Sequence, residues 1–253
     1  MLEVHQFPCL SDNYGYLLHD ADSQETVCID TPDADEYLRQ AAERGWQITQ
    51  IWNTHWHPDH AGGNLAIKAV TGCRITAPAA DGSRIEGADC LVGQGDVVSL
   101  GDWRATVLDV GGHTRGHIAY YLPDSGMAFV GDAVFALGCG RMFEGDPDQF
   151  WTSLKRLKAL PAETMLYCAH EYTASNARFA LHADPDNREL QLYAEEITRR
   201  RNNGLPTVPA KLERELKTNP FLRADDADMQ RRWGHPGDPV ATFAALRLAK
   251  DTF

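Results

Sequence analysis

One short segment, His55-Trp56-His57-Pro58-Asp59-His60, constrains the fold of this chain more than any other feature. A hydrophobic core would not tolerate so many polar side chains without partners, and a solvated loop would not need tryptophans beside them. The segment follows the apolar run Ile48–Trp52, which is typical of a strand, and it precedes Gly62-Gly63, which leads into a helical pattern. We therefore predict that it occupies a loop at the carboxyl end of a strand.

The composition of this loop indicates metal binding. Imidazole nitrogens and carboxylate oxygens are the ligands that zinc, iron and manganese take in proteins. On an extended segment His55 and His57 project to the same side, whereas Asp59 and His60 lie beyond the bend at Pro58. The spacing therefore favours two adjacent metal positions over one.

Three other predicted strands end in a side chain of the same kind. His113 follows the strand Trp103–Val110, Asp132 follows Gly126–Val130, and His170 follows Thr164–Tyr167. Taken alone, such a histidine is usually an ordinary one and a Gly-Asp pair is usually a turn. Because α/β-type sheets place their sites at the carboxyl ends of strands, the set together predicts the remaining ligands.

The first two thirds of the chain and the last third have different patterns. Short β-rich runs alternate with Gly-rich turns up to Tyr172, and strand signals are absent from Ala174 onward. Besides the three strands that precede His113, Asp132 and His170, the predicted strands are Tyr14–His19, Glu25–Asp30, Ile48–Asn53, Ile75–Ala77 and Ile118–Leu122. The predicted helices are Ala34–Arg44, Gly63–Val70, Pro147–Ala159, Ala174–Ala183, Arg188–Arg201, Ala210–Lys217, Asp225–Trp233 and Pro239–Ala249. The sequence thus predicts an α+β or α/β body over residues 1–173 and a helical domain over residues 174–253.

Composition excludes several classes of protein. With 24 Lys and Arg against 36 Asp and Glu, the net charge of −12 argues against a nucleic-acid partner, which needs a basic face. No apolar run approaches the roughly 18 residues of a membrane span, and no secretory signal is visible, so we expect a cytoplasmic protein. The 6 cysteines are scattered and form no C-x-x-C pair, so we expect them to be buried without a redox role.

The order of these motifs resembles the metallo-β-lactamase superfamily. The motifs are H-x-H-x-D-H at 55–60, G-H-T-x-G-H at 112–117, Gly131-Asp132 and the late His170. Within the superfamily the chain is similar to the glyoxalase II (hydroxyacylglutathione hydrolase) family, on the segments 138–145, 170–173, 219–223 and 246–250. The resemblance covers the whole chain. It implies an αββα metallo-β-lactamase sandwich over residues 1–173 and an all-helical substrate-binding domain over residues 174–253.

The resemblance also implies a binuclear site that holds two divalent metal ions, with Zn²⁺ first and iron or manganese as alternatives. One ion would take His55, His57 and His113, and the other would take Asp59, His60 and His170, with Asp132 bridging the two. Asp59 and Asp132 would be the catalytic residues, with Asp59 also orienting the attacking hydroxide. His117 falls outside this set, and we expect it to support a ligand or the fold. His5, His19, His182 and His235 lie in no motif and are expected to be ordinary histidines.

The implied activity is hydrolysis of an S-(2-hydroxyacyl)glutathione, typically S-D-lactoylglutathione, to glutathione and D-lactate by a hydroxide that bridges the metals. This is the second step of methylglyoxal detoxification. The sequence contains no G-x-S-x-G nucleophile elbow, and this chemistry requires none. The implied substrate contacts are Arg141, Phe143, Tyr172, Arg247 and Lys250.

Two of these contacts depart from the pattern of some family members, which have Lys and Tyr at positions 141 and 143. Arg141 keeps the charge and can bind a carboxylate with two parallel hydrogen bonds. Phe143 lacks the phenol, so affinity for glutathione rather than the chemistry would change. Arg247 and Lys250 stand three residues apart, which also fits a solvated helix face.

Other functions remain as alternatives. A persulfide dioxygenase of the same superfamily uses a single iron and lacks the helical third, and a lactonase, a β-lactamase, a nuclease or a catalytically silent binding protein fits less well. The expected partner is a small glutathione thioester, with no nucleic acid and no membrane, and the chain is expected to be a monomer.

Overall fold

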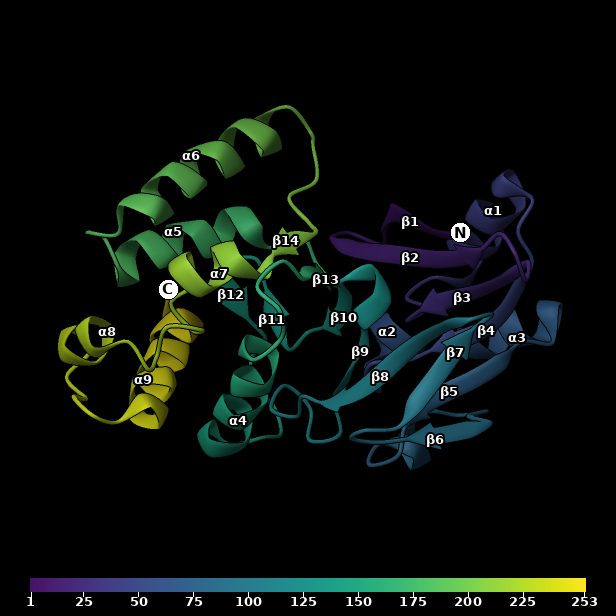
Figure 1. The fold of residues 1–253 in the computed structure, drawn as a ribbon, viewed down its shortest axis with the longest axis horizontal. Coiled ribbons are helices and arrows are strands. Elements are labelled where there is room, and N and C mark those ends of the chain that lie inside the picture. The colour runs from purple at the N-terminus through teal and green to yellow at the C-terminus, as the bar shows by residue number, and fades with distance from the viewer. The chain divides into compact units, whose positions relative to one another are not determined.

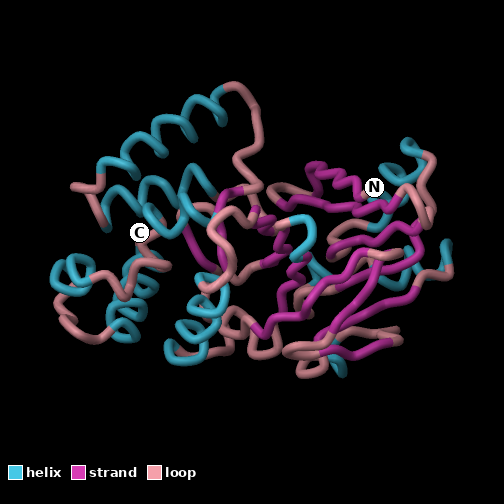
Figure 2. Tube along the Cα trace, viewed as in Figure 1, coloured by secondary structure: helices cyan, strands magenta, loops and turns pink.

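The computed structural model describes residues 1–253, which form two compact units (Figure 1). Unit 1 comprises Met1–Asp109 and Arg115–Gly131, and unit 2 comprises Val110–Thr114 and Asp132–Phe253. Strands make up most of the first unit and helices most of the second, as the magenta and cyan segments of Figure 2 show. None of the helices has the length and apolar character that a membrane span requires.

A six-stranded sheet forms one layer of unit 1. Its strands are β1 (Leu2–Cys9), β2 (Asn13–Asp20), β3 (Glu25–Ile29), β4 (Ile48–Trp52), β5 (Arg74–Pro78) and β6 (Cys90–Val92), in that order. The pairs β1–β2 and β2–β3 are antiparallel, and β3 to β6 are parallel. The connections contain α1 (Ala34–Arg44), α2 (Pro58–Ala61), α3 (Asn64–Thr71) and the 3₁₀ turn η1 (Gly82–Arg84). Parallel strands need such crossovers, so the carboxyl ends of β3, β4 and β5 meet at one edge.

Helix α1 covers the outer face of this sheet and illustrates how the sequence sets an element's limits. The Asp33 side chain caps its start by accepting from the amides of Asp35 and Glu36, and Gly45 ends it in the left-handed conformation. Its buried Tyr37 packs with Leu17, Ile51 and Ile75 of the strands and Ile67 of α3 in one apolar cluster.

Unit 1 also contains four antiparallel strands of a second layer. These are β7 (Val97–Leu100), β8 (Trp103–Asp109), β9 (Ile118–Leu122) and β10 (Met127–Gly131), with the 3₁₀ turn η2 (Pro123–Ser125) before β10. Aromatic rings fill the space between the two layers. Tyr16 meets Phe129 with ring centroids 5.5 Å apart, and Trp52 meets Tyr120 at 5.3 Å. The Tyr120 hydroxyl donates to the Asn53 carbonyl at 2.8 Å, so the loop after β4 is fixed from this layer.

Unit 2 consists of helices around short strands. Its elements are β11 (Val134–Phe135), β12 (Gly138–Cys139), α4 (Pro147–Lys158), β13 (Met165–Cys168), α5 (Thr173–Ala183), α6 (Arg188–Asn202), β14 (Ala210–Lys211), α7 (Leu212–Thr218), α8 (Ala227–Arg232) and α9 (Pro239–Thr252). Leu137, at the turn of the β11–β12 hairpin, packs into the apolar cluster between α5 and α6. Helices α4 and α9 pack through Phe150 and Phe243, with ring centroids 5.4 Å apart.

The structure differs from the sequence predictions at several short elements. Strands β1, β6, β7, β11 and β12 were not predicted. Strand β1 is an edge strand that contains a proline and is only partly buried, and β11 and β12 contain two residues each. The alternation of apolar and polar residues that marks a strand is therefore weak in these three. The predicted helix Ala210–Lys217 was wrong at its start, because Ala210 and Lys211 pair with β13 as a strand and the helix begins at Leu212.

The prediction of buried cysteines is confirmed for five of the six, and Cys90 is half-buried. All of them are free thiols. Burial raises the pKa of Cys168 to about 12 and that of Cys9 to about 12, so neither thiol is a reactive thiolate near neutral pH.

Candidate metal centre

The histidine-rich segment lies on the loop after β4 and on α2, as the sequence predicted. Pro58 occupies the first turn of α2, and the amide of His60 donates back to the carbonyl of His57 at 2.9 Å. The loop turns His55 and His57 toward each other, with His55 Nε2 3.0 Å from His57 Nδ1. The ring centroid of His55 also lies 3.9 Å from that of His60. Unit 1 thus gathers three imidazoles into one cluster.

A buried carboxylate that the sequence analysis missed orients this cluster. Asp30 follows β3 with a backbone φ of +56°, which is uncommon for a residue with a side chain. Its Oδ2 accepts from His60 Nδ1 and from the Thr54 hydroxyl, each at 2.8 Å, and its Oδ1 accepts from the Thr54 amide at 2.7 Å. A proton held on Nδ1 leaves the lone pair of His60 on Nε2, where a metal ligand needs it.

The same relay reaches the first histidine of the motif. His55 Nδ1 lies 3.1 Å from the Thr54 hydroxyl oxygen, which already donates to Asp30. The imidazole therefore donates from Nδ1, and its lone pair also lies on Nε2. The strand-end rule that selected Asp132 could have found Asp30, because the predicted strand Glu25–Asp30 ends on it.

His117 supports the cluster rather than joining the ligand groups. It is fully buried, and its ring stacks on that of His55 with centroids 4.5 Å apart and planes 20° apart. Gly131 faces both this ring and Thr54 with a φ of +50°. A Cβ there would lie 2.6 Å from the Thr54 hydroxyl and 2.8 Å from the His117 ring. Only glycine fits before Asp132.

Unit 2 contributes the other predicted ligands, and each follows a strand as expected. His113 comes after β8, Asp132 after β10, and His170 after β13. Asp132 is 7% exposed and directs one oxygen at each histidine: Oδ2 lies 3.4 Å from His113 Nε2, and Oδ1 lies 3.4 Å from His170 Nε2. A carboxylate shared between two imidazoles in this way suits a bridging ligand.

The backbone of the β11–β12 hairpin orients His113. The Nδ1 atom of His113 donates to the carbonyl of Arg141 at 2.8 Å, which leaves the lone pair of the imidazole on Nε2. Gly140 makes this close approach feasible, because a Cβ there would lie 2.1 Å from the Asp132 carbonyl oxygen and 3.0 Å from His113 Nδ1.

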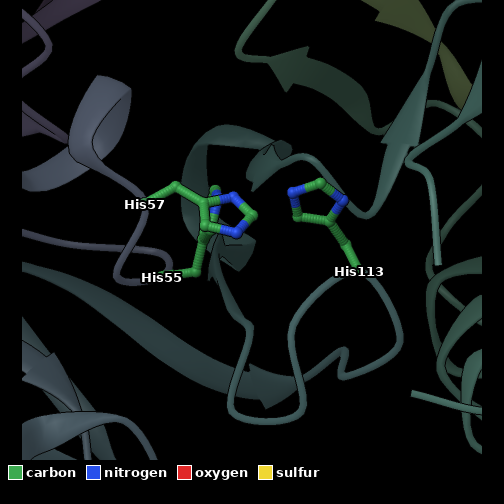
Figure 3. A group of neighbouring side chains, drawn as sticks. All are labelled: His55, His57 and His113. Atoms are coloured by element: carbon green, nitrogen blue, oxygen red, sulfur yellow. The ribbon is translucent and has the colours of Figure 1, made fainter. Parts of the chain in front are cut away.

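Three groups of side chains could each hold a metal ion. They are His55, His57 and His113; His55, His60 and Asp132; and Asp59, His60 and His170, and within each group the ligand atoms lie within 4.8 Å of one another. Figure 3 shows the first group, with the three imidazole rings directed at a common space. The donor set is nitrogen and carboxylate oxygen, which fits zinc, iron or manganese and gives no site for a soft thiolate-binding ion.

Two exposed aromatic rings lie on the ligand histidines of unit 2. Tyr172 stacks on His170 with centroids 4.7 Å apart and planes 1° apart, and Phe143 meets His113 edge-on at 5.2 Å. Both were predicted as substrate contacts. Phe143 is 62% exposed and Tyr172 is 37% exposed, so both rings present apolar surface beside the ligands.

The predicted cations share one electrostatic environment. Burial lowers the pKa of Lys250, and the positive charges of Arg247, Arg178 and Arg141 lower it further. Arg178 on α5 was not predicted as a member of this cluster. Its only signal in the sequence was its position on the predicted helix Ala174–Ala183, close to Tyr172. Lys250 Nζ donates to the Ser175 hydroxyl at 3.3 Å. Unit 2 thus carries a local positive cluster in a chain of net charge −12.

Arg247 differs from the other cations because it is almost entirely buried. It is 4% exposed, and its guanidinium donates to the Cys139 carbonyl at 2.9 Å and to the Asp251 carboxylate at 3.0 Å. The interpretation of this position as a solvated helix face is therefore wrong. Its role as a direct substrate contact stays a prediction.

The histidines outside the motifs take part in ordinary packing. His19 stacks on Trp46 at 4.6 Å and bonds the Thr26 hydroxyl, and His5 bonds Gln40. His182 lies near the ring of Phe253 at 5.3 Å.

Family models match both parts of the chain. Residues 16–170 match the metallo-beta-lactamase superfamily model, and residues 171–253 match the model of the hydroxyacylglutathione hydrolase C-terminus. The two models therefore meet immediately after His170.

Curated relatives match over the full length. A protein of Erythrobacter litoralis named hydroxyacylglutathione hydrolase is 66% identical over 100% of both chains. A protein of Hyphomonas neptunium with the same name is 59% identical over 100% of this chain and 99% of its own. Among solved structures, a metallo-beta-lactamase from Staphylococcus aureus matches with a TM-score of 0.68 at 21% identity, covering 99% of this chain and 71% of its own. That likeness, together with the helical C-terminal part, confirms the predicted fold class.

Proposed function

Since the chain belongs to the hydroxyacylglutathione hydrolase family of the metallo-β-lactamase superfamily, we propose that it hydrolyses S-(2-hydroxyacyl)glutathione thioesters. S-D-lactoylglutathione is the first candidate, with glutathione and D-lactate as products. The observation that carries the proposal is the His and Asp cluster in a chain that is 66% identical over its whole length to a relative of that name. The C-terminal family match does not favour persulfide dioxygenase or lactonase activity.

Seven residues would hold two divalent ions in the proposed site. His55, His57 and His113 form one set, Asp59, His60 and His170 form the other, and Asp132 joins them. The proposal is supported by the spacing of the candidate groups and by the two oxygens of Asp132, each directed at a different imidazole. We propose zinc as the ion, because the all-N/O set suits it, and iron and manganese share the same ligands.

The reaction needs a nucleophile, a stabilised oxyanion and a leaving group. Two ions in this site supply Lewis-acid polarisation of the carbonyl and a water of lowered pKa. Asp59 has a side chain that is 42% exposed, and its Oδ2 lies 3.6 Å from His60 Nε2. This carboxylate can accept a hydrogen bond from the attacking water and hold it toward the thioester carbon. The water oxygen forms the new C–O bond and gives up one proton, and the C–S bond breaks with its electron pair on sulfur. The sulfur leaves as a thiolate that takes up a proton, and the product acid loses its own proton to become a carboxylate.

The leaving group makes a strong protein acid unnecessary. A free thiol has a pKa of about 8.5, so a thiolate can leave before it is protonated and takes up its proton afterwards. The proposed reaction uses none of the cysteines, of which five are buried and Cys90 is half-buried.

The positive cluster of unit 2 would bind the two carboxylates of glutathione. Arg141 is exposed and Lys250 is half-buried, so both can reach a ligand. Arg247 would contribute mainly its charge, because its guanidinium already bonds the hairpin carbonyls. The exposed rings of Phe143 and Tyr172 would pack against the peptide backbone beside the thioester. Specificity for glutathione thus rests on the attraction between its carboxylates and the positive cluster of unit 2, in a protein whose net charge is otherwise negative.

Thiol release from S-D-lactoylglutathione by the purified protein, with metal content measured on the same sample, tests the proposal. A matched substrate is the lactoyl thioester of N-acetylcysteamine, which keeps the reacting bond and lacks both carboxylates. We expect rapid release from the first and much slower release from the second. Oxygen consumption with glutathione persulfide would instead indicate the dioxygenase. No thiol release by protein that holds two metal ions per chain would refute the proposed function. The cytoplasmic location and the monomeric state expected from the sequence stay predictions.

A further inference from the structure

The β11–β12 hairpin links two residues of the proposed site over a short stretch of unit 2. It begins just after Asp132 and ends just before Arg141. Its two strands contain only two residue pairs, Val134 with Cys139 and Phe135 with Gly138, so the ladder by itself is weak. The carbonyl of Arg141 is also the acceptor that orients His113. Any movement of the hairpin would therefore displace Arg141, a predicted substrate contact, and with it the carbonyl that orients the predicted ligand His113.

The turn of this hairpin requires support from outside. Leu137 has a φ of +57°, a conformation that residues with side chains rarely adopt, and it is fully buried. Its amide is directed away from the two-residue ladder. A buried amide without an acceptor would destabilise the fold by about 1–3 kcal/mol.

Glu215 of α7 provides that acceptor. Its Oε2 accepts from the Leu137 amide at 2.8 Å and from Asn219 Nδ2 at 3.0 Å. Asn219 Nδ2 also lies 3.1 Å from the Phe135 carbonyl and 3.0 Å from the Gly138 carbonyl. One carboxyl and one amide, a single helical turn apart, therefore hold both strands and the turn between them. In Figure 1, α7 lies beside the β11–β12 hairpin.

The environment of Glu215 is costly for a carboxyl group. Its side chain is fully buried, and its hydrogen-bonding partners are the Leu137 amide, Asn219 and the Tyr193 hydroxyl, which lies 3.3 Å from Oε1. Burial raises the pKa of Glu215 to about 7, although these hydrogen bonds and the charge of Arg214 oppose the shift. An apolar side chain would pack here without that cost but would leave the Leu137 amide unpaired.

We propose that Glu215, together with Asn219, is a positioning residue for the reaction: it fixes the β11–β12 hairpin so that the Arg141 carbonyl holds His113 and the Arg141 side chain faces the substrate. The inference rests on the proposed function. Glu215 touches neither substrate nor metal ligands directly and acts only through the hairpin.

The test compares two substitutions of Glu215 with a control of similar destabilisation. Glu215→Gln keeps an oxygen for Leu137 and Asn219 and offers its amino group to the Tyr193 oxygen, so we expect near-normal kcat and KM. Glu215→Leu removes the acceptor, and we expect a loss of tenfold or more in kcat/KM. Leu17→Ala opens a cavity in the apolar cluster of unit 1, which does not include Leu137, and should lower Tm without this loss. All are assayed well below the Tm of each variant.

A second measurement does not depend on activity. Zinc affinity, measured by competition with a chelator, should fall at least tenfold for one ion in Glu215→Leu and stay unchanged in Glu215→Gln and Leu17→Ala. If Glu215→Leu does not fold, Asn219→Ala removes the hairpin contacts from the other member of the pair, and the same losses are expected.

Two results would overturn the proposal. One is normal kcat/KM and zinc affinity in Glu215→Leu, and the other is an equal loss in Leu17→Ala, which would make the effect one of general stability. A wild-type protein that binds two zinc ions but releases no thiol would refute the proposed function alone, and the zinc affinities would still decide the role of Glu215.

Discussion

Replacing Asp30 by asparagine should weaken one metal position selectively. In the wild type, Oδ2 of Asp30 accepts the proton on His60 Nδ1 at 2.8 Å, and the two side chains are 8% and 1% exposed. An asparagine must place its amino group either against the Thr54 amide, which is also a donor, or against His60. The second arrangement is cheaper, and it forces the imidazole proton onto Nε2, where it blocks the ligand atom.

The magnitude follows from the role of such outer carboxylates. Loss of the partner of a ligating histidine typically weakens metal binding by about 10- to 100-fold, or about 1.4–2.8 kcal/mol. The effect should be larger on the ion proposed at Asp59, His60 and His170 than on the other ion, whose ligand His55 is linked to Asp30 only through the Thr54 hydroxyl. Activity should fall at low metal concentration and recover in part when zinc is raised.

The assay is a chelator competition on metal-free protein that is reloaded with zinc, read as two binding constants. Asp33→Asn is the matched control, because an asparagine caps α1 as well as an aspartate does. Unchanged affinity at both positions in Asp30→Asn, or an equal change in Asp33→Asn, would refute the assigned role of Asp30.

Three further outcomes follow from buried or clustered groups. The pKa of the Glu215 carboxyl is 4.5 in the unfolded chain and about 7 in the folded chain, so the folded chain keeps this proton to higher pH. The free energy that Glu215 contributes to stability therefore falls by roughly 3 kcal/mol as the pH rises from below the first value to above the second. Glu215→Gln should gain that much in free energy of unfolding, relative to wild type, between about pH 4.5 and pH 8 in denaturant titrations; parallel pH curves for the two proteins would contradict the shift. Lys250→Met should raise KM about tenfold and spare kcat, with Lys155→Met as the unaffected control, and an unchanged KM would remove Lys250 from the anion site. His57→Ala should lose one metal ion per chain by elemental analysis and nearly all activity, whereas His235→Ala should retain both, and full metal content in His57→Ala would refute its assignment as a ligand.

Long, strongly patterned features of the chain could be predicted from sequence. The histidine motif and the three strand-end ligands were found because several chemically distinctive side chains recur at one kind of position, the carboxyl end of a strand. Helices such as α1 and α9 were also predicted close to their observed limits, because a periodic apolar face and a capping aspartate mark them.

The supporting groups could not be predicted in the same way. Glu215 is a single carboxylate whose role depends on a partner distant in sequence, the Leu137 amide. The position of Asp30 at a strand end was detectable, but its contacts with Thr54 and His60 depend on tertiary structure. The β11–β12 hairpin was missed because two-residue strands have no periodicity to detect. Arg247 was predicted as a substrate contact, with a solvated helix face as the alternative, and only tertiary packing shows that it is buried against the hairpin.

The central claim is that this cluster binds metal ions that the chain needs to hydrolyse a glutathione thioester. The most direct test measures thiol release from S-D-lactoylglutathione by protein that a chelator has stripped of metal. Zinc is then added back, and the number of zinc ions bound per chain is measured together with the rate of thiol release. The account predicts negligible release from stripped protein and recovery that reaches its plateau at two ions per chain. Undiminished thiol release from protein shown to contain no metal would contradict it.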